Sequence, residues 1–301
     1  MGTPDFSVPC LQRLIDDGHE ITGVFTQPDK PKGRHGVLTP PPVKELALKY
    51  GIEVFQPVKM RDGTALEMLK KAAPELVIVV AYGKILPSEI LHWPKYGCIN
   101  IHASLLPELR GAAPIQWAIL SGLKKTGVTS MQMDEGLDTG DMLLKGEIEI
   151  DDDMDAETLH DELSLMGASV MHDTIEQLIK GELKPVKQQG ESTYASMLSK
   201  DISPVDWSKT AREVHNHIRG LYSWPCASAG LDGKRVKLLK SRLADVKGKA
   251  PGEIIIDGGR MFAVCGDLNA VEILVIQAEN KKAMNVADYL RGNPVETLKF
   301  E

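Results

Sequence analysis

Hydrophobic positions in the first half of the chain follow two alternating periods. Short runs rich in β-branched residues are separated by stretches in which apolar residues recur every three or four positions. The run 77–80 is continuously apolar, which is typical of a parallel strand buried on both faces. The pattern predicts strands over residues 21–27, 53–55, 76–81, 98–102 and 127–133. It predicts helices over residues 9–17, 42–50, 64–73, 87–92 and 113–120.

This alternation predicts an α/β fold with a doubly wound, mostly parallel sheet, in which ligands bind at the carboxyl ends of the strands. A long helix is predicted over residues 155–179, with an apolar face of Leu159, Leu163, Leu165, Met166, Val170 and Ile175. Residues 208–222 again have a helical pattern, and four or more short strands with glycine-containing turns follow. Such strands favour a small β-barrel of the oligonucleotide-binding type. We expect domains over 1–181 and 207–301, joined by a linker over 182–206.

Composition supports two globular domains, since the 301 residues are 43% apolar and 26% charged. The net charge of −7 hides an asymmetry, with about +3 from Gly181 onward and about −10 before it. The four cysteines form no CxxC pair, so neither a disulfide framework nor a zinc site is expected. No apolar run reaches the roughly 18 residues that a membrane helix needs, and residues 1–9 contain no signal pattern. We expect a cytoplasmic monomer without a membrane partner or a metal.

The segment from Gly97 to Gly111 contains the most informative polar residues. Residues two apart in a strand share a face, so Asn100 and His102 should project together near the strand's carboxyl end. An isolated Asn-x-His is more often a satisfied structural pair. Here a tight Ser-Leu-Leu-Pro turn follows at once, and the acidic turn 134–141, between two β-like runs, offers carboxylates that could pair with the imidazole. These neighbours favour a catalytic interpretation over the structural one.

Several motifs together resemble those of the methionyl-tRNA formyltransferase family. Asn-x-His and Ser-Leu-Leu-Pro are shared with all folate-dependent formyltransferases, whereas three other motifs point to the tRNA enzyme. The motifs are Gly2-Thr3-Pro4-Asp5-Phe6, Gln27-Pro28-Asp29-Lys30-Pro31-Lys32-Gly33-Arg34, Ala81-Tyr82-Gly83-Lys84-Ile85-Leu86-Pro87, residues 99–107, Arg110-Gly111-Ala112-Ala113-Pro114-Ile115 and residues 131–141. The likeness spans nearly the whole chain.

The resemblance implies transfer of a formyl group from 10-formyltetrahydrofolate to the α-amino group of initiator methionyl-tRNA, for translation initiation, without a metal. It implies a catalytic trio of Asn100, His102 and Asp138. It implies folate contacts by Ser104, Leu105, Leu106, Pro107, Ile85, Leu86 and Asp134. It also implies tRNA contacts by Lys30, Lys32 and Arg34, and a tRNA-binding C-terminal barrel.

Two segments of the chain are rich in lysine and arginine. Lys30, Lys32 and Arg34 lie among prolines and a glycine, which predicts a mobile surface loop without helix or strand. The hairpin-like segment 234–242 carries five basic residues, and both a solvated surface and phosphate contact remain open for it. In the helix 208–222, the spacing of Val214, Ile218 and Leu221 predicts packing on the barrel rather than a base-stacking platform.

One departure from the family and several rival functions remain. The family has an apolar strand before Gly-Thr-Pro-Asp-Phe, whereas this sequence opens at Met1-Gly2, so we expect either that the true start lies upstream or that neighbouring apolar faces of the sheet are exposed. An amino-sugar N-formyltransferase is the nearest rival, and a glycinamide ribonucleotide transformylase would resemble the first domain alone. A dinucleotide-binding oxidoreductase would need a GxGxxG turn, which is absent. A non-catalytic RNA-binding module would bind tRNA without transferring a formyl group.

Overall fold

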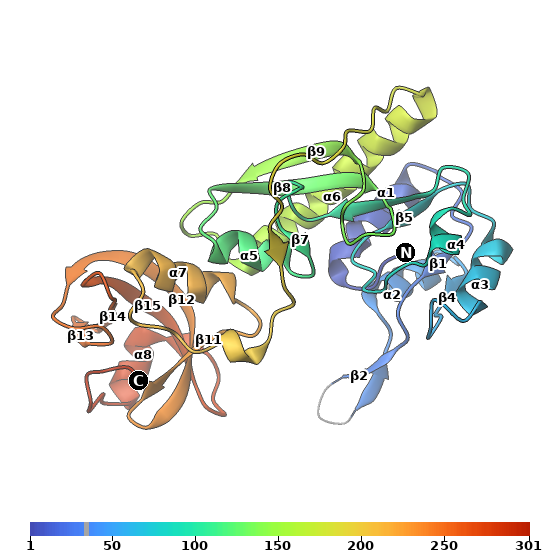
Figure 1. Ribbon diagram of the computed structural model, residues 1–301. Coiled ribbons are helices and arrows are strands. Elements are labelled where there is room, and N and C mark those ends of the chain that lie inside the picture. Colours follow the sequence, from blue (N-terminus) through green and yellow to red (C-terminus); the bar gives the residue numbers. More distant parts are fainter. Residues whose placement is uncertain (33–35) are drawn as a thin grey trace. The chain divides into compact units, whose positions relative to one another are not determined.

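The computed structural model describes residues 1–32 and 36–301 and divides into two compact units. The first unit comprises Met1–Gly111, Thr126–Ile148 and His160–Tyr194, and the second comprises Ala112–Lys125, Glu149–Leu159 and Ala195–Glu301. Each unit has its own sheet and covering helices (Figure 1). In the described residues no helix combines the length and apolarity required to cross a bilayer.

The first unit is built on an open sheet in the order β5-β6-β8-β9. Strand β5 (Val77–Val79) runs parallel to β6 (Cys98–His102), and β6 runs antiparallel to β8 (Lys125–Gln132), which neighbours β9 (Met142–Glu149). A parallel pair, β1 (Val24–Phe25) and β4 (Val54–Phe55), lies on the other side of β5. The predicted α/β class is confirmed, because helices and strands alternate along this unit.

Met1 and Gly2 lie between β5 and β1. The Met1 carbonyl oxygen accepts a hydrogen bond from Val80 N at 2.9 Å, and Gly2 N donates to Phe25 O at 3.0 Å. Phe25 and Val80 are each 3% exposed, so the expected exposure of the neighbouring apolar faces is not observed at these two residues. A strand was predicted over residues 21–27, but β1 pairs over only two residues. Its partner β4 also has only two paired residues.

The helices of the first unit begin and end close to the predicted positions. They are α1 (Val8–Asp16), α2 (Pro42–Lys49), α3 (Thr64–Ala72), α4 (Ser88–Leu91) and the long α6 (Ala156–Lys180). A 3₁₀ turn that was not predicted, η1 (Asp5–Ser7), precedes α1. On α6 the predicted apolar face is correct except for Leu165, which is 64% exposed. Residues two apart on a helix point about 200° away from each other, so Leu165 cannot share the face of the fully buried Leu163.

A β-hairpin occupies the basic segment for which a loop was predicted. Strand β2 (Lys30–Lys32) pairs antiparallel with β3 (Val37–Thr39), and this hairpin projects from the first unit (Figure 1). The prediction of no strand here was wrong. Both strands of an isolated pair are edge strands, so Pro31, which lacks an N–H donor, fits into one of them.

The second unit contains an antiparallel sheet in the order β11-β12-β15-β14-β13, with β16 also paired to β15. Several shorter elements accompany this sheet. The bounds are β11 (Ala227–Leu231), β12 (Lys234–Lys247), β13 (Ile254–Asp257), β14 (Arg260–Val264), β15 (Asn269–Ala278), β16 (Met284–Asn285), α5 (Pro114–Leu120), α7 (Ala211–Gly220), α8 (Val286–Gly292) and η2 (Lys200–Ile202). Two short strands, β7 (Arg110–Gly111) and β10 (Tyr194–Ala195), pair separately.

The strand path of this second sheet is open, and residues 298–301 bridge its two edges. Phe300 forms an isolated bridge with Leu231 of β11, and Lys299 forms one with Glu253 beside β13. Phe300 is 2% exposed and stacks on Trp207 at 4.9 Å between ring centroids. The second unit is therefore β-rich as predicted, but its sheet is open: the predicted barrel closure is not formed by a ladder, and the C-terminal segment adds only single bridges beside the two edge strands.

Helix α7 packs on the second unit's sheet as its spacing predicts. Val214, Ile218 and Leu221 are all at most 1% exposed and belong to, or directly follow, this helix. The helix begins with a capping box in which Thr210 and Glu213 satisfy each other's backbone N–H groups. Trp207 lies in the same core, so it is not available as a base-stacking platform.

Candidate active site

Three polar side chains meet at the carboxyl end of β6 in the first unit. Asn100 and His102 lie two apart on this strand, and Asp138 approaches them from the loop between β8 and β9. Asn100 Nδ2 is 3.5 Å from Asp138 Oδ1, and His102 Nδ1 is 3.8 Å from Asp138 Oδ2. The side chains of His102 and Asp138 are only 7% and 12% exposed. The sequence-predicted trio therefore forms one cluster, whose place in the sheet matches the expected ligand-binding edge.

The backbone of Leu109 and Gly111 holds two members of this cluster. His102 Nε2 lies 2.9 Å from the carbonyl oxygen of Leu109, which can only accept a hydrogen bond. Nε2 must therefore carry a proton, and in the neutral imidazole Nδ1 presents its lone pair toward Asp138. Gly111 N donates to Asp138 Oδ2 at 2.8 Å, so this carboxylate oxygen is already engaged by the backbone.

An outer layer of hydrogen bonds surrounds the cluster. Gln188 donates to the carbonyl oxygens of Asp138 and Gly140 at 2.8 and 2.9 Å, and accepts from the guanidinium of Arg110. Thr193 Oγ1 accepts from Leu109 N at 2.8 Å, and its carbonyl oxygen accepts from Arg110 N at 2.9 Å. The segment containing Gln188 and Thr193 thus supports both the 109–111 segment and the Asp138 loop.

Hydrogen bonds from β8 and β9, and one within the turn, fix the Ser-Leu-Leu-Pro turn that follows β6. The Ser104 hydroxyl donates to Glu108 O at 2.6 Å, and Thr129 Oγ1 both donates to Ser104 O and accepts from Leu106 N. Lys145 Nζ donates to Leu106 O at 2.6 Å. Ser104 and Leu106 are fully buried, and Leu105 and Pro107 are half-buried. The half-buried pair presents the side chains of this turn that remain accessible to a ligand.

The remaining predicted folate contacts differ in their surroundings. Ile85 is 67% exposed, whereas Leu86 is 4% exposed and belongs to the core around β5. Asp134 Oδ1 accepts hydrogen bonds from Gly136 N at 3.0 Å and Thr139 Oγ1 at 2.7 Å, within its own turn. An accessible ligand surface is therefore available at Ile85, and Asp134 shapes the loop that presents Asp138.

Two of the three predicted tRNA contacts lie on the β2–β3 hairpin. Lys30 and Lys32 belong to β2, and Arg34 lies outside the described residues. The base of the hairpin is fixed by Lys44, whose ammonium donates to both carboxylate oxygens of Asp29 and to Gln56 Oε1. The hydrogen bond from Lys44 lowers the pKa of Asp29, so the carboxylate stays charged and the base stays paired.

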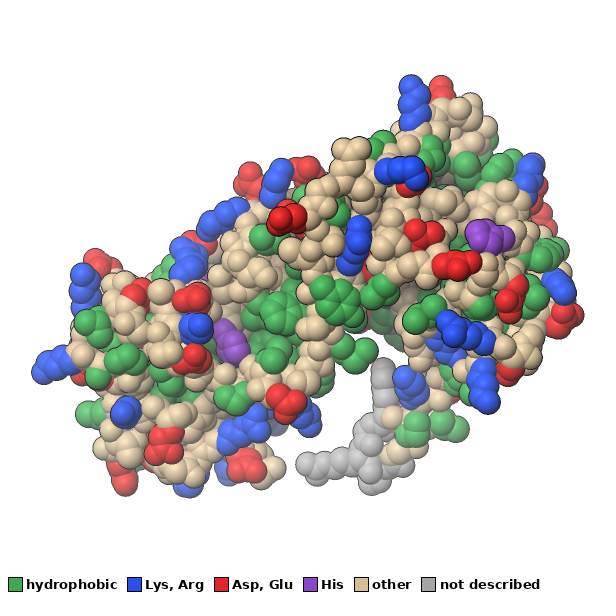
Figure 2. Space-filling view, viewed as in Figure 1, with side chains coloured by type: hydrophobic (Ala, Val, Ile, Leu, Met, Phe, Trp, Pro, Cys, Tyr) green, Lys and Arg blue, Asp and Glu red, His purple; other side chains and the backbone are tan. Residues whose placement is uncertain are grey.

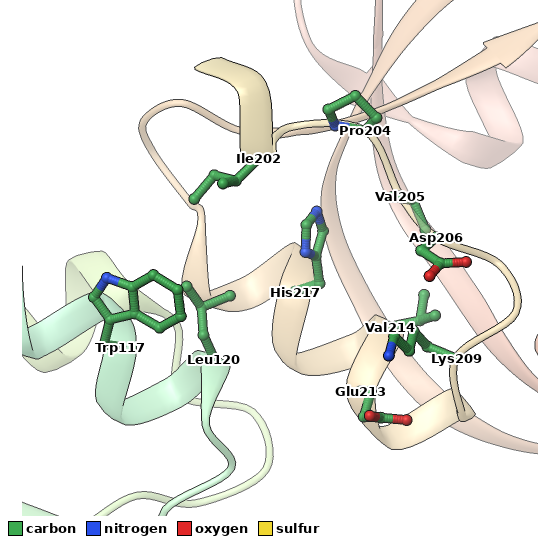
Figure 3. A pocket seen from close by; sticks show the side chains of 10 residues that line it. All are labelled: Trp117, Leu120, Ile202, Pro204, Val205, Asp206, Lys209, Glu213, Val214 and His217. Carbon is green, nitrogen blue, oxygen red and sulfur yellow. The ribbon is translucent and has the colours of Figure 1, made fainter. Parts of the chain in front are cut away.

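A separate cavity of about 260 Å³ lies within the second unit (Figure 3). The indole of Trp117 on α5 and the imidazole of His217 on α7 face it, together with Ile202 of η2. No member of the Asn100, His102 and Asp138 cluster lines this cavity. Within the described residues, no group of three or more His, Cys, Asp or Glu side chains is arranged to hold a metal ion.

Comparisons with known proteins identify the family. A formyl transferase model matches residues 1–175, and a model of the formyl transferase C-terminal domain matches residues 197–294. Methionyl-tRNA formyltransferase of Caldanaerobacter subterraneus subsp. tengcongensis is 47% identical over 98% of this chain and 96% of that protein. The enzyme of the same name from Alkaliphilus oremlandii is 49% identical at the same coverage. The chain belongs to the methionyl-tRNA formyltransferase family. The resemblance inferred from the motifs is thereby confirmed.

Solved structures support the same fold. An N-formyltransferase from Helicobacter canadensis, crystallised with folinic acid and dTDP-3-aminofucose, has a TM-score of 0.69 and 20% identity. It aligns over 92% of this chain and 97% of its own. The sugar 3N-formyltransferase WlaRD, with dTDP and 5-N-formyl-THF, has a TM-score of 0.68 and 22% identity, over 93% and 97% of the two chains. At this identity the likeness supports the architecture and not the substrate.

Several residues around the site were not found from the sequence. Gln188 and Thr193 lie in the stretch interpreted as a linker, where no periodic pattern marks them. Lys145 lies on β9, the β-like run after the acidic turn 134–141, but no role was predicted for it. Of this network the sequence marked Arg110, through its place in the Arg-Gly-Ala-Ala-Pro-Ile motif. The identity of its partner could not be read from the sequence.

Proposed function

We propose that this chain transfers the formyl group of 10-formyltetrahydrofolate to the α-amino group of methionyl-tRNA. The convergence of Asn100, His102 and Asp138 is the observation that carries this proposal. Membership of the methionyl-tRNA formyltransferase family supports the choice of substrates. We infer that the chain acts as a monomer in the cytoplasm, where initiator tRNA would be its partner.

The roles of the three side chains follow from the charges that develop in formyl transfer. When the amine attacks the formyl carbon, a C–N bond forms and negative charge builds on the formyl oxygen. Asn100 Nδ2 would donate to this oxygen, and so would His102 Nδ1 when that nitrogen carries a proton, an effect worth roughly 3 kcal/mol per well-placed donor. Asp138 would accept the proton that the attacking amine must lose, directly or through a water, contributing roughly 10²- to 10⁴-fold. The leaving folate nitrogen then takes a proton as its bond to the formyl carbon breaks.

Binding surfaces can be assigned to the two substrates by their chemistry. The accessible apolar side chains Leu105, Pro107 and Ile85 suit the flat, largely apolar faces of a pterin. The ammonium groups of Lys30 and Lys32, with the guanidinium of Arg34, suit tRNA phosphates. We assign catalysis to residues 1–181 and further tRNA contact to residues 207–301, connected by residues 182–206.

The decisive experiment is a formyl-transfer assay with 10-formyltetrahydrofolate and, in parallel, methionyl-tRNA or an aminated nucleotide sugar. We expect formylation of methionyl-tRNA alone. His102→Ala should lower kcat by at least roughly 10²-fold while binding of folate, measured by calorimetry, is retained. Formylation of the sugar alone would refute the proposed substrate, and near-normal turnover by His102→Ala would refute the proposed role of the imidazole.

A further inference from the structure

The side chain of Gln188 uses its whole hydrogen-bonding capacity beside the catalytic loop. Its Nε2 donates to Asp138 O at 2.8 Å and to Gly140 O at 2.9 Å. Its Oε1 accepts from Arg110 Nη2 at 2.7 Å and from Arg110 Nε at 3.1 Å. A primary amide offers two donors and two acceptor lone pairs, so Gln188 is saturated in this arrangement. Such an amide is held rigidly between the guanidinium and the loop.

The dipeptide Arg110-Gly111 holds both the side chain and, through Gln188, the backbone of Asp138. Gly111 N holds the carboxylate at 2.8 Å, and Arg110 holds Gln188, which in turn holds the backbone carbonyl of Asp138. Asp138 has φ of +53°, a left-handed conformation that non-glycine residues adopt rarely. Such a conformation persists only where surrounding contacts enforce it. Gln188 Nε2 donates to the backbone carbonyl oxygen of Asp138, so this contact acts directly on the residue with the left-handed conformation.

We propose that Gln188 is a positioning residue that fixes Asp138 in the orientation required for proton transfer. This inference rests on the proposed function, in which Asp138 accepts the amine proton. Removing the amide leaves two loop carbonyls without their donor and the Arg110 guanidinium without its acceptor. The loop can then leave the left-handed geometry, and the carboxylate moves relative to Asn100 and His102. A displacement of about 1 Å is enough to lower a catalytic rate substantially.

Steady-state kinetics of the full chain with methionyl-tRNA and 10-formyltetrahydrofolate test this role. Gln188→Ala should lower kcat by about 10- to 100-fold while KM for each substrate changes by less than about 3-fold. Gln188→Glu should behave in the same way, because a carboxylate still accepts from Arg110 but cannot donate to the two carbonyls. The neighbouring Gln189, which is exposed, supplies the control Gln189→Ala with unchanged kinetics. Thermal unfolding of each variant verifies that it is folded at the assay temperature.

A double-mutant cycle separates positioning from a general structural effect. If Gln188 acts through Asp138, adding Gln188→Ala to Asp138→Asn should cause less than about 3-fold further loss of kcat. Full multiplication of the two losses, or a kcat for Gln188→Ala equal to that of Gln189→Ala, would overturn the inference while leaving the proposed function intact. Absence of formyl transfer by the unaltered chain would instead refute the proposed function, and this inference with it.

Discussion

At the scale of single residues, Lys145 links β9 to the turn that follows β6. Its ammonium donates to Leu106 O at 2.6 Å although the residue is otherwise exposed. Lys145→Met should loosen this turn and raise KM for 10-formyltetrahydrofolate by about 5-fold, equivalent to loss of about 1 kcal/mol. The change in kcat should be smaller, since Lys145 does not contact the proposed catalytic residues Asn100, His102 and Asp138. Lys184→Met, at another exposed lysine of the same unit, is the control, and equal KM values for both variants would contradict the expectation.

Glu272 is an ion-paired carboxylate in the second unit whose ionisation stabilises the fold. Its hydrogen bonds with Arg260, and then with Arg242, lower its pKa from 4.5 to about 2 although burial opposes this. A lowered pKa gives a contribution that is complete above about pH 4.5 and is lost as pH falls toward about 2. We expect Glu272→Gln to cost roughly 2 kcal/mol at neutral pH, after allowance for the half-exposed arginines.

Urea denaturation at a series of pH values measures this contribution. The difference in the free energy of unfolding between the original chain and Glu272→Gln should decrease steadily as the pH falls from about 4.5 to about 2. Glu279→Gln, at an exposed position in the turn that follows β15, should show little difference at any pH. A Glu272→Gln difference that stays constant down to about pH 2 would show that the lost stability comes from packing and not from the charge.

The candidate site was predictable from the sequence only where local geometry determines it. The two-residue spacing of Asn100 and His102 in a strand places them on one face, and no further information was needed. Asp138 was assigned through the family resemblance alone, because its loop could join the strand end only through tertiary structure. Gln188 carried no signal, since its partners are distant in sequence and its own segment has no periodicity.

At the scale of elements, helix α6 allows a direct test of burial. Leu163 is fully buried and Leu165 is 64% exposed, on the same helix and with the same side chain. Leu163→Ala should lower the free energy of unfolding by about 3 kcal/mol, the cost of lost burial plus a cavity. Leu165→Ala should change it by less than about 0.5 kcal/mol. Chemical denaturation of both variants measures these changes, and equal decreases in the free energy of unfolding would mean that the buried face of α6 is assigned incorrectly.

Elements with a strong hydrophobic period were predicted well, and those without one were not. Strand β6 and helices α1, α2 and α3 agree with the prediction to within one residue at each end. The β2–β3 hairpin was missed because its stability depends on pairing between two short strands and not on an apolar face. Strand β9 was indicated only as a β-like run after the acidic turn, without bounds, since much of it is exposed.

At the scale of the whole molecule, the net charge of −7 is an obstacle to binding a polyanion. Lys and Arg side chains are mixed with Asp and Glu on the visible face (Figure 2), so tRNA binding should depend on local groups. Raising salt from about 50 to 200 mM should increase KM for methionyl-tRNA far more than KM for 10-formyltetrahydrofolate. Lys30→Ala and Arg34→Ala should each reduce the logarithmic salt slope of the tRNA KM by about 1. An unchanged slope would exclude these side chains from phosphate contact.

Residues 298–301 have a consequence for how the second unit tolerates proteolysis. They satisfy backbone groups of Gly230 and Gly252 and insert the Phe300 ring into the core. Gly230 is required for this approach, because a Cβ there would lie 2.9 Å from Glu301 Cβ. Loss of these four residues would expose the backbone groups of Gly230 and Gly252 and leave an apolar cavity where the Phe300 ring packs. A chain without them should associate with other copies of itself, so the presence of residues 298–301 should be verified before any light-scattering measurement.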